Sequence, residues 1–150
     1  MVDYIKLKKE IEALTDGVPY LISNLSNISA CINEHLPNIN WVGFYLKEND
    51  ELILGPFQGK SACIRIPIGK GVCGKAAEQG KILLVPNVHE FDGHIACDSA
   101  SNSEIVIPIM KNGELFGVLD IDSPIKGRFT EDDRSGLLLV ASAIEKMLSK

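Results

Sequence analysis

Four cysteines are the side chains of this sequence with the greatest potential for redox chemistry: Cys31, Cys63, Cys73 and Cys97. The first residues lack an apolar signal segment, so we expect reduced thiols that are structural, metal-binding or catalytic. Cys97 lies in the polar stretch 93–101, where a purely structural thiol would be unusual. Cys63 is expected in a strand, and Cys73 at the positive start of a helix, which favours a thiolate. Cys31 is expected to be a small buried apolar residue.

Three carboxylates form a second group. Asp120 and Asp122 are expected on one side of a strand end, with Ile121 turned into the core. Glu104 opens a neighbouring predicted strand whose isoleucines face the opposite way. A single acidic residue at a strand end is usually just solvated. Three converging carboxylates, however, suit a ligand ammonium, and their mutual repulsion raises the pKa so that one can hold a proton.

Two aromatic residues flank a glycine on a predicted strand. Period-two alternation places Trp41, Gly43 and Tyr45 on one face, and the apolar core stripe of the same strand on the other. The glycine is expected to leave a gap between the two rings. This pattern alone is compatible with two surface-leaning aromatics or with a small pocket that has aromatic walls.

Other chemistries fit the sequence less well. Residues 69–76 nearly match a phosphate-binding loop, but Ala76 replaces the hydroxyl residue that binds Mg²⁺, which favours a glycine turn before a helix. A zinc site is possible by count from one set: Cys63, Cys73, Cys97 and His94. The absence of any closely spaced cysteine pair disfavours it, and no metal is expected. His89 and His94 are the available bases for a cysteine hydrolase, but a lone loop histidine more often serves as a hydrogen-bonding residue.

The composition is that of an ordinary globular chain. Its 150 residues include 45% hydrophobic and 23% charged residues, and the formal net charge is −5 with a pI near 5.2. The charge argues against a nucleic-acid partner, because no basic footprint for phosphates is present. No apolar run approaches the roughly 20 residues that span a bilayer. We therefore expect one domain over residues 1–150, in the cytoplasm, with a small molecule as its partner.

The hydrophobic period changes along the chain and predicts the elements. Helices are expected at 3–14 and 19–36, strands at 41–47, 51–57 and 62–66, a short helix at 72–79, strands at 82–85, 104–110 and 115–121, and a final helix to residue 148. Residues 87–103 have no clear period and form a long polar segment of the kind that often carries function. Adjacent hairpins with helices gathered at the chain ends indicate the α+β class, an antiparallel sheet covered by helices.

With these residues in view, the sequence resembles the free methionine-R-sulfoxide reductases, enzymes built on a GAF domain. The matching segments are residues 39–45, 54–60, 63–67, 71–74, 93–101, 103–106 and 117–123. The cysteine trio 63, 73 and 97, together with the stretch Gly-His-Ile-Ala-Cys-Asp-Ser-Ala-Ser, is the specific part of the match. The Asp-Ile-Asp strand alone is weak evidence for this family of reductases, since it recurs among GAF domains.

The resemblance implies a six-stranded antiparallel sheet with flanking helices, often paired into a homodimer. It implies that Cys97 attacks the substrate, that Cys63 closes a disulfide with it, and that Cys73 is a third family cysteine with an uncertain role. It also implies a substrate pocket with acidic and aromatic walls, formed by Glu104, Asp120, Asp122, Trp41 and Tyr45.

The implied reaction reduces free L-methionine-R-sulfoxide with no metal or organic cofactor. The Cys97 thiolate attacks the sulfoxide sulfur while a carboxylic acid protonates the oxygen, which leaves a sulfenic acid. Cys63 then forms a disulfide, which a dithiol such as thioredoxin reduces. The alternative is a non-enzymatic GAF module that senses a small ligand or the redox state.

Overall fold

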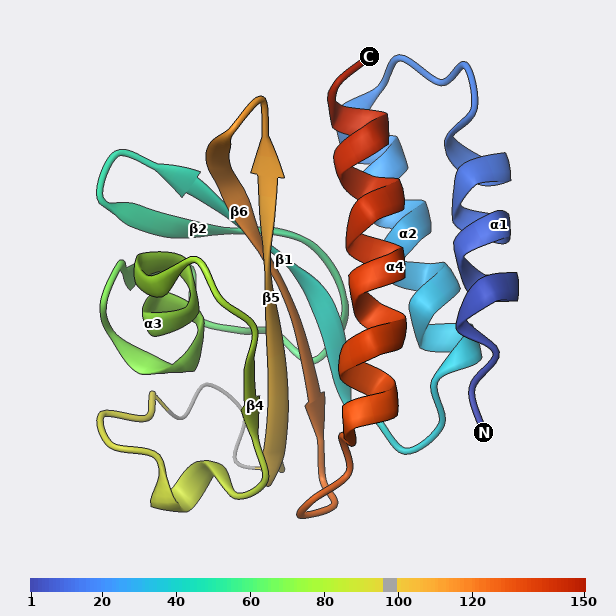
Figure 1. Cartoon of the computed structure of the whole chain (residues 1–150). Helices are drawn as coiled ribbons and strands as arrows, with labels where there is room; N and C mark the ends of the chain where they lie inside the picture. Colours follow the sequence, from blue (N-terminus) through green and yellow to red (C-terminus); the bar gives the residue numbers. More distant parts are fainter. Residues whose placement is uncertain (96–99) are drawn as a thin grey trace.

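A six-stranded antiparallel sheet organises the chain in the computed structural model, which describes residues 1–95 and 100–150 (Figure 1). Its strands are β1 (Trp41–Glu48), β2 (Glu51–Gly59), β3 (Arg65–Pro67), β4 (Leu83–Val85), β5 (Ser103–Lys111) and β6 (Glu114–Ser123). They lie in the order β3-β2-β1-β6-β5-β4, and every neighbouring pair is antiparallel. The expected α+β class and the six-stranded sheet are confirmed.

Helices cover both faces of the sheet, but unequally (Figure 1). Three of them lie on one side: α1 (Tyr4–Thr15), α2 (Leu21–His35) and α4 (Glu131–Leu148). The short α3 (Gly71–Gln79) lies on the other side, and a 3₁₀ turn, η1 (Val88–Glu90), follows β4. In the described ranges, no helix is both long and apolar enough to cross a bilayer.

The ends of the helices have clear local causes. The Asp3 side chain caps α1 by accepting a hydrogen bond from the Lys6 N–H, and Thr130 forms a reciprocal capping box with Asp133 at the start of α4. Helix α3 ends at Gly80, whose left-handed φ of 64° suits a residue without a Cβ. Each cap pairs backbone groups that would otherwise be unsatisfied at the helix end.

The two faces of the sheet enclose two separate apolar clusters. Val42 and Phe44 of β1 belong to the larger cluster, beneath α2 and α4, together with the isoleucines of β5. Trp41 and Tyr45 belong to the smaller cluster, beneath α3. The predicted alternation of β1 is confirmed, but the aromatic face is buried rather than surface-leaning, because α3 and the segments around it cover it.

Helix α1 is the outermost of the three helices and packs on α2 and α4. The hydroxyl of Tyr4 donates a 2.6 Å hydrogen bond to Asp133 Oδ1 in a buried position. The Tyr4 ring packs so tightly on Gly136 that a Cβ at this position would lie 2.6 Å from Tyr4 Cε2. Glycine is therefore required there by close approach of α1 to α4.

The third strand differs from the prediction. A strand was expected at 62–66, but β3 is Arg65–Pro67, so Cys63 lies in the preceding irregular segment. The carbonyl oxygens of Lys60 and Cys63 accept hydrogen bonds from Trp41 Nε1 (3.1 Å) and Tyr45 Oη (2.8 Å). Side-chain donors thus bind the carbonyls of Lys60 and Cys63, whereas the Ile64 carbonyl accepts from the Leu54 N–H of β2, and periodicity alone does not reveal such side-chain contacts.

Candidate active site

The three predicted carboxylates come together on the α3 side of the sheet. Glu104 of β5 and Asp122 of β6 are directly opposite each other in the register, and Asp120 lies two residues earlier in β6 on the same face. Their exposed fractions are 7%, 9% and 5% in that order, so they are buried rather than solvated at the strand ends. Ile121 points into the larger core, as expected. The predicted convergence of the three carboxylates is confirmed.

Burial changes the protonation of this cluster. The pKa of Glu104 is raised well above its usual range, first by burial and then by the nearby charges of Asp120 and Asp122. Burial also raises the pKa of Asp120, although hydrogen bonds from its neighbours oppose this. The buried Oδ1 atom of Asp120 has no hydrogen-bond partner among the described residues. The cluster therefore retains a proton more readily than isolated carboxyls do, and it has an acceptor ready for a cationic ligand.

Cys73 completes the buried polar group from the side of α3. Its Sγ lies 3.8 Å from Glu104 Oε2, and the residue is 5% exposed. Burial and the charges of the three carboxylates raise the pKa of the Cys73 thiol well above its usual range. The expectation that the helix start favours a thiolate is therefore wrong, because desolvation and nearby negative charge outweigh the positive end of α3.

An aromatic row forms one wall of the site. The rings of Trp41 and Tyr45 are stacked with centroids 5.9 Å apart, and Phe57 of β2 stacks on the other side of Trp41 at 5.1 Å. The expected gap above Gly43 is absent, because a Cβ there would lie only 2.7 Å from Phe57 Cα. The glycine allows β2 to approach β1 closely, and it does not create the cavity.

The cavity lies beside these rings instead. Its lining residues are Trp41, Tyr45, Ala62, Ile66, Lys70, Gly71, Val72, Cys73, His94, Ile95, Ser101, Glu104, Asp120 and Asp122. All five residues predicted to bind substrate are in this set, together with Cys73. Sequence reasoning missed Lys70, Ser101 and Ile95 as cavity residues, and their only signal was proximity to the glycine turn and the long polar segment.

The cysteines differ in their bonding. Cys63 is disulfide-bonded, and its carbonyl is held by Tyr45. Cys31 and Cys73 are free thiols. Cys97, predicted to be the attacking residue, lies outside the described residues.

The described ends of the 87–103 segment are firmly attached to the sheet. Asn40 Nδ2 donates a 3.1 Å hydrogen bond to Ser101 Oγ, and Asn102 N–H donates to the Ser123 carbonyl at 2.8 Å. His89 Nε2 lies 2.8 Å from Asn102 Oδ1, which agrees with the hydrogen-bonding role for a loop histidine. Partial burial and the neighbouring His89 lower the pKa of His94, so its ring is neutral at pH 7.

Cys73, Glu104 and Asp120 also have the donor atoms of a metal site, which lie within 4.8 Å of one another. Their arrangement suits either of two cationic groups, a metal ion or the ammonium group of an organic ligand. The adjacent aromatic wall distinguishes between them, because it provides apolar surface for an organic ligand and no further metal donors.

The near match to a phosphate-binding loop is a turn that leads into α3, as expected, with φ values of 96° at Gly69 and 63° at Gly71.

Comparisons with known proteins agree with this geometry. The sequence pattern of the GAF domain family matches residues 17–148. A protein of Escherichia coli (strain K12) named free methionine-R-sulfoxide reductase is 51% identical over 146 residues, which are 97% of this chain and 88% of that protein.

Two solved structures are similar over almost the whole chain. The reduced form of the Staphylococcus aureus protein called fRMsr has a TM-score of 0.96 and 52% identity, covering 99% of this chain and 97% of that one. Its complex with substrate has a TM-score of 0.94 and 51% identity over the same shares. The chain therefore belongs to the GAF domain family and, within it, to the free methionine-R-sulfoxide reductases.

Proposed function

We propose that this chain is an oxidoreductase that reduces free L-methionine-R-sulfoxide to methionine. The observation that carries the proposal is the group of three buried carboxylates beside an aromatic wall in one cavity. A relative that is 51% identical to this chain is named for this activity, and a similar protein, also 51% identical, was solved in complex with its substrate. We propose that residues 1–150 act as one GAF unit, because the cavity draws on segments from Trp41 to Asp122.

The carboxylates account for the choice of a free amino acid. A free substrate has an ammonium group that can pair with Asp120 Oδ1, which has no hydrogen-bond partner within residues 1–95 and 100–150, and that can offset the charge of Asp122. A methionine within a peptide has an uncharged amide nitrogen, which leaves the buried carboxylates without a counter-charge. We propose that Lys70, which lines the cavity, receives the substrate carboxylate together with backbone N–H groups from the long polar segment. The rings of Trp41 and Tyr45 face the apolar part of the substrate.

The proposed reaction begins at the sulfoxide sulfur. The Cys97 thiolate attacks this sulfur, and Glu104, whose pKa is raised by burial and by the neighbouring carboxylates, donates a proton to the sulfoxide oxygen. The protonated oxygen then moves from the substrate sulfur to the Cys97 sulfur as the bond between the two sulfurs breaks, so that methionine leaves with its sulfur reduced and Cys97 becomes a sulfenic acid. The Cys63 thiol then attacks this sulfenic sulfur, so that water leaves and a disulfide forms. Two thiols are thus oxidised for each sulfoxide reduced.

The bonding of the described cysteines supports these roles. Cys63 is disulfide-bonded and lies in the irregular segment next to the cavity, and we propose that Cys97 is its partner. Cys73 is a free, buried thiol against Glu104, and its raised pKa favours the protonated form. We therefore propose that Cys73 helps to form the pocket and supports the proton on Glu104, rather than attacking substrate itself.

Regeneration requires an external reductant. We propose that a dithiol protein of the thioredoxin kind reduces the disulfide, in the cytoplasm, where such dithiols keep thiols reduced. The reaction needs no metal or organic cofactor, since the thiols supply both electrons.

We also propose that two copies form a homodimer, in line with the exposed apolar side chains of Ile5, Tyr20, Ile22 and Leu138 on the helical layer.

The decisive experiment follows methionine formation from three substrates with excess dithiothreitol: the free R epimer, the free S epimer and an N-acetylated R epimer. We expect many turnovers with the free R epimer, and little with the N-acetylated compound because it lacks the ammonium. Cys97→Ser is expected to abolish turnover, and Cys31→Ser, outside the cavity, to retain it. No turnover with any of the three compounds would contradict the proposal and favour the sensory GAF module, which stops at a single disulfide.

A further inference from the structure

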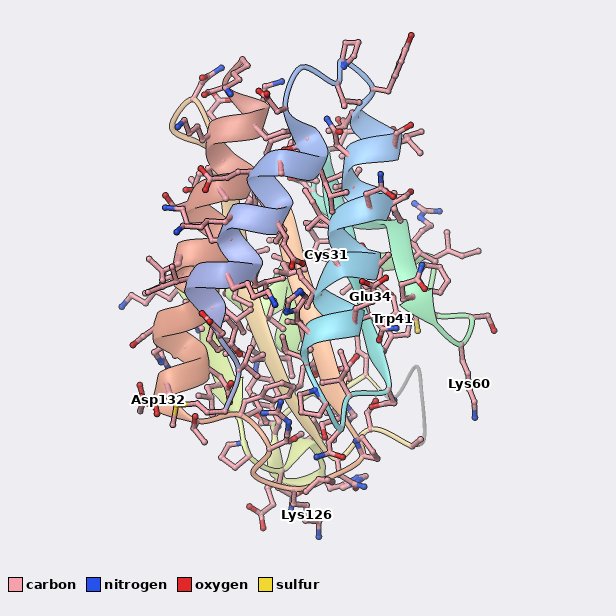
Figure 2. The ribbon with its side chains drawn as sticks, turned by 90° about the vertical axis from the view of Figure 1, so that its right-hand side faces the viewer. Cys31, Glu34, Trp41, Lys60, Lys126 and Asp132 are labelled. Atoms are coloured by element: carbon pink, nitrogen blue, oxygen red, sulfur yellow. The ribbon has the colours of Figure 1, made fainter. Side chains whose placement is uncertain are left out.

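A second group of reactive side chains lies on the opposite side of the sheet from the cavity. Glu10 of α1 and Cys31 and His35 of α2 meet where these two helices pack together. Figure 2 looks onto this side, with Cys31 between the two helices and Glu34 further along α2. No step of the proposed reaction uses any of these residues.

The three side chains are arranged around one carboxylate oxygen. Glu10 Oε2 lies 2.5 Å from His35 Nε2 and 3.6 Å from Cys31 Sγ. Donor atoms of all three residues lie within 4.8 Å of one another. Cys31 and His35 are four residues apart in α2, so they share one face of the helix, and α1 supplies the third group. The position is therefore fixed by the packing of two helices.

Burial of the group is graded from the core to solvent. Cys31 is 4% exposed, whereas the side chains of His35 and Glu10 are 19% and 41% exposed. An ion pair between Glu10 and His35 explains the contact of those two residues, but it does not require a thiol directed at the same oxygen. A buried sulfur, an imidazole nitrogen and a half-exposed carboxylate, open to solvent on one side, have the donor types that bind Zn²⁺.

We propose that Glu10, Cys31 and His35 form a binding site for one divalent transition-metal ion of the Zn²⁺ type. Zinc–ligand distances are about 2.3 Å for sulfur, 2.0–2.1 Å for nitrogen and 2.0–2.2 Å for oxygen, which place tetrahedral ligand atoms roughly 3.3–3.8 Å apart. The spacing of Glu10 and Cys31 already fits, and Glu10 has to move from His35 by somewhat less than 1 Å. Its half-exposed side chain is free to do so.

Charge around the site is consistent with a cation. Binding replaces the thiol proton of Cys31 with the metal ion, and this proton is released. Glu34 contributes nearby negative charge and Lys6 nearby positive charge. A water molecule or Glu34 completes the fourth position. The thiolate excludes hard ions such as Mg²⁺ and Ca²⁺, which prefer oxygen ligands. The ion links α1 to α2 and has no contact with the substrate cavity.

The test uses Co²⁺, whose bond to a thiolate gives an intense near-ultraviolet charge-transfer band. The full chain carries Cys63→Ser and Cys97→Ser, which leaves the thiols of Cys31 and Cys73. We expect one Co²⁺ per chain, a thiolate band, and displacement of the ion by Zn²⁺. In this background Cys31→Ser is expected to remove the band. His35→Gln leaves the buried thiol in place and is expected to weaken binding about tenfold or more, since even second-shell changes cost 10–100-fold.

Cys73→Ser is the matched control, because Cys73 belongs to the other cluster with metal-binding donor types among the described residues. We expect the band and the affinity to be unchanged in this variant. Circular dichroism verifies that each variant is folded before titration. The proposal is overturned by the absence of a thiolate band at saturating Co²⁺, by a band that survives Cys31→Ser, or by a band that is lost with Cys73→Ser.

Discussion

The hydrogen bond from Tyr45 to the Cys63 carbonyl provides a way to separate the two chemical steps of the proposed reaction. Replacing Tyr45 with phenylalanine keeps the ring that stacks on Trp41 and removes only the 2.8 Å bond to the segment that carries Cys63. We expect the first step, methionine formation, to be unaffected, since the cavity wall and the carboxylates remain. Disulfide formation should become slower, because the Cys63 segment loses its attachment to β1.

The magnitude follows from the single bond removed. A typical hydrogen bond contributes about 1 ± 0.5 kcal/mol, and a buried acceptor left unpaired costs about 1–3 kcal/mol. The carbonyl of Cys63 is only partly buried, so water restores some of the loss, and about 1–1.4 kcal/mol remains. Since 1.4 kcal/mol corresponds to about tenfold in an equilibrium constant, disulfide formation should slow by about five- to tenfold.

The assay mixes reduced protein with one equivalent of free methionine-R-sulfoxide and no reductant. Quenched samples give the rate of methionine formation by chromatography and the rate of thiol loss by alkylation and mass spectrometry. Tyr4→Phe is the matched control, since it removes another buried tyrosine hydroxyl, which bonds to Asp133 far from the cavity. That variant should melt at a lower temperature and keep both rates. Equal slowing of the two steps in Tyr45→Phe, or no slowing of either, would refute the reasoning.

Three further substitutions test the site and its support. Burial raises the pKa of Glu104 in the folded state, so the protonated carboxyl stabilises the fold at low pH and this stabilisation is lost as the pH rises through that pKa. Glu104→Gln cannot lose a proton, so its melting temperature relative to wild type should increase from about pH 5 to about pH 9. A difference that does not depend on pH would contradict the raised pKa of Glu104. Gly43→Ala places a Cβ 2.7 Å from Phe57 Cα and should cost about 1–3 kcal/mol in urea denaturation; wild-type stability would disprove the close packing of β1 on β2. Gly136→Ala displaces the Tyr4 ring and should speed hydrogen exchange in α1 while turnover is kept; unchanged exchange would show that the ring adapts.

The sequence predicts the sheet well where a strand buries one face or both. The alternation in β1 and the isoleucines of β5 gave the correct faces, because side-chain direction follows strictly from the pleat. The convergence of Glu104, Asp120 and Asp122 was also predictable, since adjacent antiparallel strands bring their polar ends together. The GAF domain match and the relatives agree with the resemblance that the cysteine motifs indicated.

The features that were missed depend on contacts between segments far apart in the sequence. Phe57 fills the space above Gly43 because of the register between β1 and β2, which no local pattern specifies. Cys63 lies before the strand in which it was expected, and its carbonyl accepts a hydrogen bond from Tyr45, a contact that no local pattern specifies. The pKa of Cys73 is raised by carboxylates from other strands, so its position at a helix start gave the wrong direction. Periodicity determines which face a residue occupies, but it does not determine its neighbours.

The burial of the Asp120 carboxylate, with one oxygen that has no partner in the described part of the chain, has a consequence for how the relatives of this chain diverge. A buried carboxylate cluster works against folding, and apolar or amide side chains of similar volume at these positions would give a more stable protein. Selection for a folded GAF domain alone therefore removes the cluster, and only selection for ligand binding or turnover retains it. Among GAF domains of unknown role, three carboxylates at the positions of Glu104, Asp120 and Asp122 should thus mark descent under functional selection, even where overall identity is low.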